Sequence, residues 1–134
     1  MIKKITILFV LVSSFITSPM YAQVVTEKGI STIELTGRSC RDGKPSDKKL
    51  QFEAIEKAKL SAWNKYTAKL SGDRNAAYLK QESSFIQSID DYIADYTILT
   101  SNCSKKDRSY SVSLRVNINE AKLNNALVVQ SGDS

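Results

Sequence analysis

Few residues of this 134-residue chain could do chemistry, because it contains two cysteines and no histidine. Histidine is the commonest general base, the usual partner of a serine or cysteine nucleophile, and a frequent zinc ligand. Its absence excludes most catalytic triads and most catalytic zinc sites. We therefore expect a protein that is not an enzyme and that needs no cofactor or metal.

The two cysteines, Cys40 and Cys103, form the main chemical feature that remains. A lone pair of cysteines in an exported protein usually forms a disulfide. A metal site or a reactive thiol would need a further cysteine or a histidine nearby, and neither cysteine has one. The pattern predicts a disulfide that closes a loop of about 63 residues, which the chain-entropy treatment values at on the order of 4 kcal/mol.

Cationic residues flank both cysteines. The group consists of Arg38, Arg41, Lys44, Lys105, Lys106 and Arg108. A disulfide would draw them to one end of the molecule, with only Asp42 and Asp107 among them. By contrast, the acidic residues in the segment 73–95 outnumber the basic ones. We interpret the basic group as a candidate docking face, and the alternative is that these loops are simply solvated.

Three acidic residues, Asp90, Asp91 and Asp95, are the only other candidates for chemistry. Neighbouring acids at a helix-to-strand transition are usually solvated, and the spacing of a calcium loop is absent. A hydrolase with a carboxylate site stays as an alternative. It requires Asp90 and Asp95 to converge in a deep pocket.

The first 22 residues have the pattern of a secretory signal peptide: two lysines, an apolar run from Ile5 to Ile16, and Ala22 before the cut. A membrane anchor would need about 20 apolar residues, more than this run provides. We expect residues 23–134 to form one domain in the periplasm or outside the cell, with no membrane span. Loss of Lys3 and Lys4 lowers the net charge from +5 to about +3, which is too small to indicate nucleic-acid binding.

Hydrophobic periodicity predicts the elements that position these residues. It indicates a strand over 24–36, a helix from a cap at Ser46 to near Gly72, and a second helix from near Asp73 with a break at Ser83 and Ser84. Strands over 93–103 and 108–118 then form a hairpin, and Asn119 caps a short helix over 120–127.

Two apolar faces dominate this pattern. The first helix carries a stripe of Ile55, Ala58, Ala62, Trp63, Tyr66 and Leu70, and the last strand alternates Tyr110, Val112, Leu114, Val116 and Ile118 with polar residues. Each apolar face must be covered. The predicted fold is therefore α+β, with a three-stranded antiparallel sheet packed on two helices in the order β-α-α-β-β-α.

Three stretches carry a family resemblance. They are the alanine-spaced helix over 54–63, the strand entry over 89–99 and the alternating strand over 110–118. Together they resemble the N-terminal domain of flagellar assembly protein T and related small periplasmic and lipoprotein domains, over roughly residues 47 to 127. The resemblance implies a non-enzymatic building or docking module at the cell envelope.

These observations predict a small secreted envelope module that binds an envelope protein or an anionic envelope polymer. A secreted inhibitor or neutralising protein of a hydrolase or toxin is the alternative. The sequence leaves the identity of the partner and the oligomeric state open.

Overall fold

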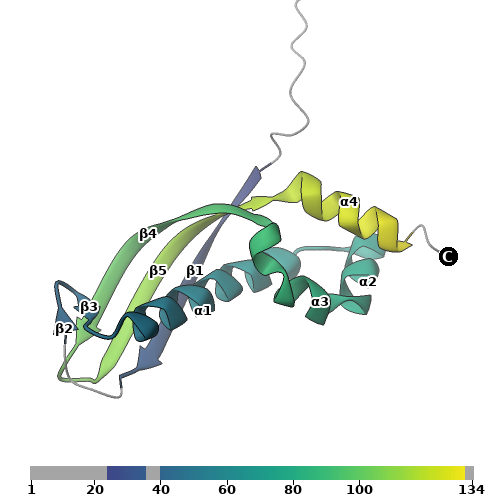
Figure 1. Cartoon of the computed structure of the whole chain (residues 1–134). Coiled ribbons are helices and arrows are strands. Elements are labelled where there is room, and N and C mark those ends of the chain that lie inside the picture. Colours follow the sequence, from purple (N-terminus) through teal and green to yellow (C-terminus); the bar gives the residue numbers. More distant parts are fainter. Residues whose placement is uncertain (1–23, 36–39, 132–134) are drawn as a thin grey trace, which may run out of the picture.

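A computed structural model describes residues 24–35 and 40–131, so the predicted signal peptide over 1–22 and Arg38 lie outside the described residues. Three strands form the main sheet: β1 (Val24–Glu34), β4 (Ile93–Ser104) and β5 (Ser109–Asn119). The long helix α1 (Lys48–Thr67) lies against one face of this sheet (Figure 1). The α+β class and the three-stranded antiparallel sheet are confirmed.

The strand order is β1-β5-β4, so the last strand in the sequence is the central one. It pairs antiparallel with both neighbours, which confirms the predicted hairpin, although each strand ends one residue later than expected. The side chains of β5 that face α1 are at most 1% exposed, namely Tyr110, Val112, Leu114, Val116 and Ile118. The alternation in the sequence therefore marks the core face.

Small residues allow α1 to approach the sheet closely. Ala54, Ala58 and Ala62 are spaced by four, lie on one face of the helix and are fully buried. The cap of α1 is Asp47, whose side chain accepts the Lys49 N–H, and not Ser46 as predicted. The helix ends at Thr67, before the predicted end, because Ala68 forms the C-cap and Gly72 already begins the next helix.

The second helical region is divided into α2 (Gly72–Lys80), α3 (Glu82–Gln87) and the short 3₁₀ helix η2 (Ile89–Asp91). The break lies at Gln81, whose backbone leaves the helical region, rather than at Ser83 and Ser84. The turn brings Phe85 against Tyr78, with ring centroids 5.3 Å apart.

The predicted packing of Trp63 in the core is confirmed. Its side chain is fully buried, its indole N–H donates to the Tyr78 hydroxyl at 2.8 Å, and its ring lies 5.8 Å from that of Tyr92. The last helix, α4 (Glu120–Ser131), begins after the predicted cap, because the Asn119 side chain accepts the Lys122 N–H at 3.0 Å. Leu123 and Leu127 of α4 are buried in the core.

The loop expected between the first strand and α1 contains a two-stranded ribbon that the sequence did not predict. Its strands are β2 (Cys40–Arg41) and β3 (Lys44–Pro45). Within the described residues, none of the helices combines the length and the apolar character needed to cross a membrane.

Candidate functional site

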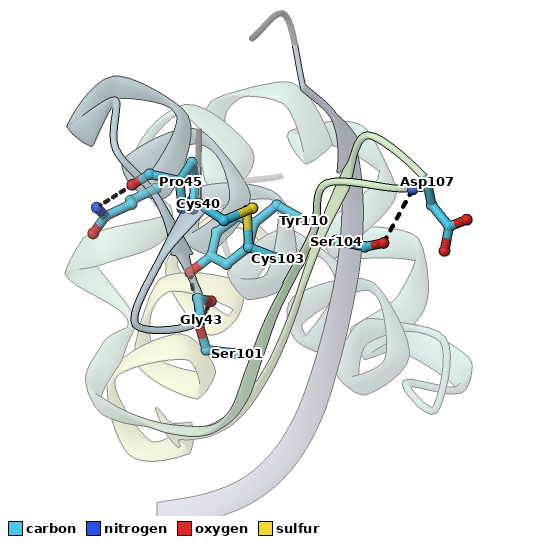
Figure 2. Close-up of a disulfide and its surroundings, with 9 residues drawn as sticks. Cys40, Gly43, Pro45, Ser101, Cys103, Ser104, Asp107 and Tyr110 are labelled. Atoms are coloured by element: carbon cyan, nitrogen blue, oxygen red, sulfur yellow. Dashed lines mark hydrogen bonds between the residues drawn. A yellow bond between two sulfur atoms is a disulfide. The ribbon is translucent and has the colours of Figure 1, made fainter. Parts of the chain in front are cut away.

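The predicted disulfide between Cys40 and Cys103 is confirmed and joins β2 to the end of β4, with the two Cα atoms 5.8 Å apart (Figure 2). A second contact supports it, because the Ser101 hydroxyl donates to the carbonyl oxygen of Gly43 at 2.9 Å. The same hydroxyl lies 3.1 Å from that of Tyr110 on β5. The ribbon is thus fixed to the sheet by covalent and polar contacts.

Two tight turns complete this end of the molecule. In the ribbon, Asp42 and Gly43 both have positive φ, at 54° and 75°. In the β4–β5 hairpin, Arg108 has a φ of 52°, and the Ser104 side chain accepts the Asp107 N–H at 3.0 Å. The carbonyl of Arg108 also accepts the Leu35 N–H at 2.9 Å, which ties the turn to the end of β1.

These turns and the start of α1 carry exposed cations, which together we call the basic end. Its members are Arg41, Lys44, Lys48, Lys49, Lys105, Lys106 and Arg108, and all are exposed. The first two lie on the ribbon, the next two open α1, and the last three form the hairpin turn. In Figure 1 the ribbon, the hairpin turn and the start of α1 lie together, opposite α2 and α3.

No member of the basic end forms an ion pair with a described residue. The five ion pairs in the described part of the chain involve other cations, namely Lys57, Lys59, Lys69 and Arg74. Three acids stand near the basic end in the sequence, Asp42, Asp47 and Asp107. The cations outnumber them, so a net positive charge faces the solvent.

Lys48 and Lys49 are the members that sequence reasoning missed. Both lie in the first turn of α1, which contains no acidic residue. The helix dipole makes this end of a helix positive, so acidic residues are favoured there and lysines are not. The predicted helix start at Ser46 was the signal that could have placed them beside the other cations.

Part of the basic end borders a shallow hollow of about 590 Å³. Arg41, Lys44 and Lys48 all line it, together with Gln51. The Gln51 side-chain amide donates to the Pro45 carbonyl at 2.8 Å, which links α1 to the ribbon. Asp42 also lines the hollow, so three cations from β2, β3 and α1 face one acid. The resulting net positive charge suits a negatively charged group.

The carboxylates of Asp90 and Asp95 bind different side chains. The Asp90 carboxylate lies 3.2 Å from the Lys59 ammonium, and the Asp95 carboxylate accepts the Asn117 amide at 2.6 Å. Lys59 also pairs with Glu56 at 2.9 Å. Burial by itself would lower the pKa of Lys59, but its bonds to the two carboxylates outweigh this effect and raise it.

A partly buried polar network joins the helices at the opposite end. The Tyr66 hydroxyl donates to the Glu120 carboxylate at 2.7 Å, and Arg74 donates to the side-chain oxygen of Asn124 at 2.6 Å. Arg74 and Glu120 approach to 3.7 Å. Burial, followed by the negative charge of Glu120, raises the pKa of Tyr66 to about 12. The network has a structural role because it ties α1, α2 and α4 together.

Comparison of the chain with models of protein families, with curated proteins and with solved structures finds no match. Over the residues that the structure covers, no group of three or more cysteine or acidic side chains is arranged to hold a metal ion.

Proposed function

We propose that this protein is a non-catalytic docking module of the bacterial periplasm, which binds the acidic surface of an envelope protein through its basic end. The signal-peptide pattern of residues 1–22 supports export, and the disulfide fits an oxidising compartment. The docking role draws its support from the arrangement of charge.

One observation carries the proposal: the exposed cations of the basic end have no ion-pair partner among the described residues, although the loops that carry them are fixed in place. A disulfide and the Ser101–Gly43 hydrogen bond hold the ribbon. Because the backbone that carries the cations is already ordered, binding costs less conformational entropy than it would for a mobile loop. Unpaired cations contribute little to the stability of the fold, whereas an acidic partner could pair with them.

The two lysines in the first turn of α1 support the same proposal. They oppose the helix dipole, which costs folding free energy that acidic residues would have contributed. An acidic partner would compensate this cost in the complex. A purely solvated surface would offer no such compensation.

The experiment is capture of partners from an envelope extract by the immobilised protein at low and at high salt. One variant removes charge from the hairpin turn, through Lys105→Ser, Lys106→Ser and Arg108→Asn. Asparagine is chosen at residue 108 because it tolerates the positive φ found there. The matched control makes the same charge change elsewhere on the surface, through Lys28→Ser, Lys65→Ser and Lys80→Ser.

We expect the hairpin variant to lose the partner and the control to keep it, with both melting curves close to that of the wild type. High salt should release the partner, because exposed charges are screened over roughly 8 to 10 Å. Capture that neither salt nor the hairpin variant reduces would contradict the proposal. Release after digestion of envelope polysaccharide would identify an anionic polymer in place of a protein.

A second candidate function is inhibition of a hydrolase or toxin, favoured by the ribbon. It presents two positive-φ residues, Asp42 and Gly43, on a turn that the adjacent disulfide holds rigid. Inhibitors commonly present such preorganised loops to their targets. Capture of a hydrolase whose activity falls on binding would favour this candidate over assembly.

A further inference from the structure

The two edges of the sheet differ in how they are protected. On β1, the Ile30 N–H donates to the Ser61 hydroxyl of α1 at 3.3 Å, and the Ser31 hydroxyl donates to the Ala54 carbonyl at 2.6 Å. Thus α1 covers the middle of this edge. On β4, every residue from 94 to 100 is exposed, and within the described chain their backbone makes no hydrogen bond outside the sheet.

The exposed part of β4 carries three large apolar side chains, and the Lys59 ammonium lies over one of them, 4.8 Å from the centre of the Tyr96 ring. Tyr96 and Ile98 are each 40% exposed, and Leu99 is 37% exposed. Natural edge strands are usually protected by lysine, proline or bulges. Here residues 94–100 hold one charge, Asp95, and two bulges leave Asp95–Ile98 as a regular segment between them. The edge can therefore pair with another strand over a short length.

The charges at the two ends of β4 indicate which strand would pair with it. The acidic residues Asp90 and Asp91 precede β4, and the cations Lys105 and Lys106 follow it directly. An antiparallel partner of the same sequence would place its own acids beside these cations, and its cations beside these acids. A parallel copy would bring like charges together. The strand is thus complementary to itself in one orientation.

We propose that two copies of this protein associate by antiparallel pairing of their β4 strands, with the two-fold axis close to Thr97. This register sets Tyr96 of each copy opposite Ile98 of the other. Both residues lie on the α1 side of the sheet, because their partners on β5 are the buried Val116 and Leu114. Aromatic and β-branched residues opposite one another stabilise antiparallel pairs.

The resulting dimer has one continuous six-stranded sheet. Its interface is the same on both copies, so the assembly closes at two, and the outer edges are the β1 strands that α1 covers. The short regular segment limits the buried area, so we expect a reversible dimer whose population depends on concentration. This inference does not depend on the proposed docking function.

Sedimentation of the protein purified after expression of the full-length chain tests the proposal. The wild type should shift from monomer to dimer as its concentration increases. Ile98→Lys should weaken the dimer by about tenfold or more, because it replaces an apolar cross-strand contact with a charge. The matched control is Ile30→Lys, an equivalent change at a 54% exposed isoleucine of β1, which should leave the dimer unchanged.

Two further variants test the orientation. Thr97→Cys should form a covalent dimer on mild oxidation, since residue 97 lies beside its own copy, whereas Ile30→Cys should not. In this register residue 91 of one copy lies opposite residue 103 of the other, so its nearest cation is Lys105. Asp91→Lys and Lys105→Glu should each weaken the dimer, and the two changes combined should restore it. A wild type that stays monomeric at every concentration would overturn the proposal, as would a dimer that is weakened by Ile30→Lys and not by Ile98→Lys.

Discussion

Gly29 of β1 lies directly against the backbone of Ala58 in α1. A Cβ atom placed on Gly29 would overlap the Ala58 carbonyl oxygen and lie 2.8 Å from the backbone nitrogen of Ala62. The glycine is required by this close approach, since both neighbours are backbone atoms that cannot rotate away. The contact sets the distance between the helix and the sheet.

Gly29→Ala should therefore destabilise the protein by about 3 kcal/mol, because the new methyl group forces α1 away from β1. Urea unfolding measures the change in the free energy of unfolding. Gly72→Ala is the control, since no atom lies within 4 Å of its Cβ position and only its positive φ opposes the change. We expect a cost of about 1 kcal/mol there, because an alanine with positive φ brings its Cβ close to the following carbonyl oxygen. Equal costs at the two positions would disprove the role of the close approach.

Removal of the disulfide should destabilise the protein and spare its fold. Replacing both Cys40 and Cys103 with alanine should lower the free energy of unfolding by about 2 to 4 kcal/mol, because the unfolded chain regains its loop entropy. Thiol labelling of the unfolded, unreduced wild type should detect no free thiol. An unchanged unfolding midpoint in the double variant would show that the bond contributes nothing to stability.

Lys48→Glu together with Lys49→Glu should stabilise the domain, because acidic residues in the first turn of α1 interact favourably with the helix dipole. The expected gain is about 0.5 to 1 kcal/mol for each change, measured by thermal unfolding at low salt. The same variant should lose the partner in the capture experiment. Lys65→Glu, in the last turn of α1, is the control and should reduce stability. A variant that gains stability and still binds would exclude Lys48 and Lys49 from the docking face.

Tyr66 should make the protein sensitive to alkali. Its pKa is raised from 10 to about 12 in the folded state by burial and by Glu120, so the folded state holds the phenolic proton more tightly than the unfolded state does. This contribution to stability is complete below pH 10 and is lost as the pH rises from 10 to 12.

The variant Tyr66→Phe removes this contribution. At pH 8 it should be less stable than the wild type by about 1 kcal/mol, because the hydrogen bond to Glu120 is lost. The difference between the two proteins should shrink above pH 10. Tyr78 and Tyr92 also have pKa values raised by burial, so a residual pH dependence should remain in both. A constant difference from pH 8 to pH 11 would show that Tyr66 is not responsible.

Local patterns in the sequence determined much of this fold. The alternation in β5 identified the core strand, because a period of two leaves only one face that can be buried. The alanine spacing identified the buried face of α1, and the cysteine pair identified the disulfide. The first two features depend only on neighbours in the chain. The disulfide could be predicted because two cysteines can pair in only one way.

Helix boundaries were less well determined. The cap at Asp47, the end at Thr67 and the break at Gln81 each lie at least one residue from the predicted position. Several residues near these points could cap or end a helix, and the contacts with the rest of the fold select among them. The same uncertainty hid Lys48 and Lys49, because a shifted helix start changes which side chains occupy the first turn.

Only the tertiary structure decided the order of the strands, and with it the open edge. The residues of β4 are typical of any strand, and nothing local states that β1 pairs with β5 and leaves Tyr96 and Ile98 exposed. Strand pairing joins residues far apart in the chain, as where Gly29 lies opposite Leu114. Which strands pair depends on which face and edge of the sheet α1 can cover. Local sequence patterns do not contain that information.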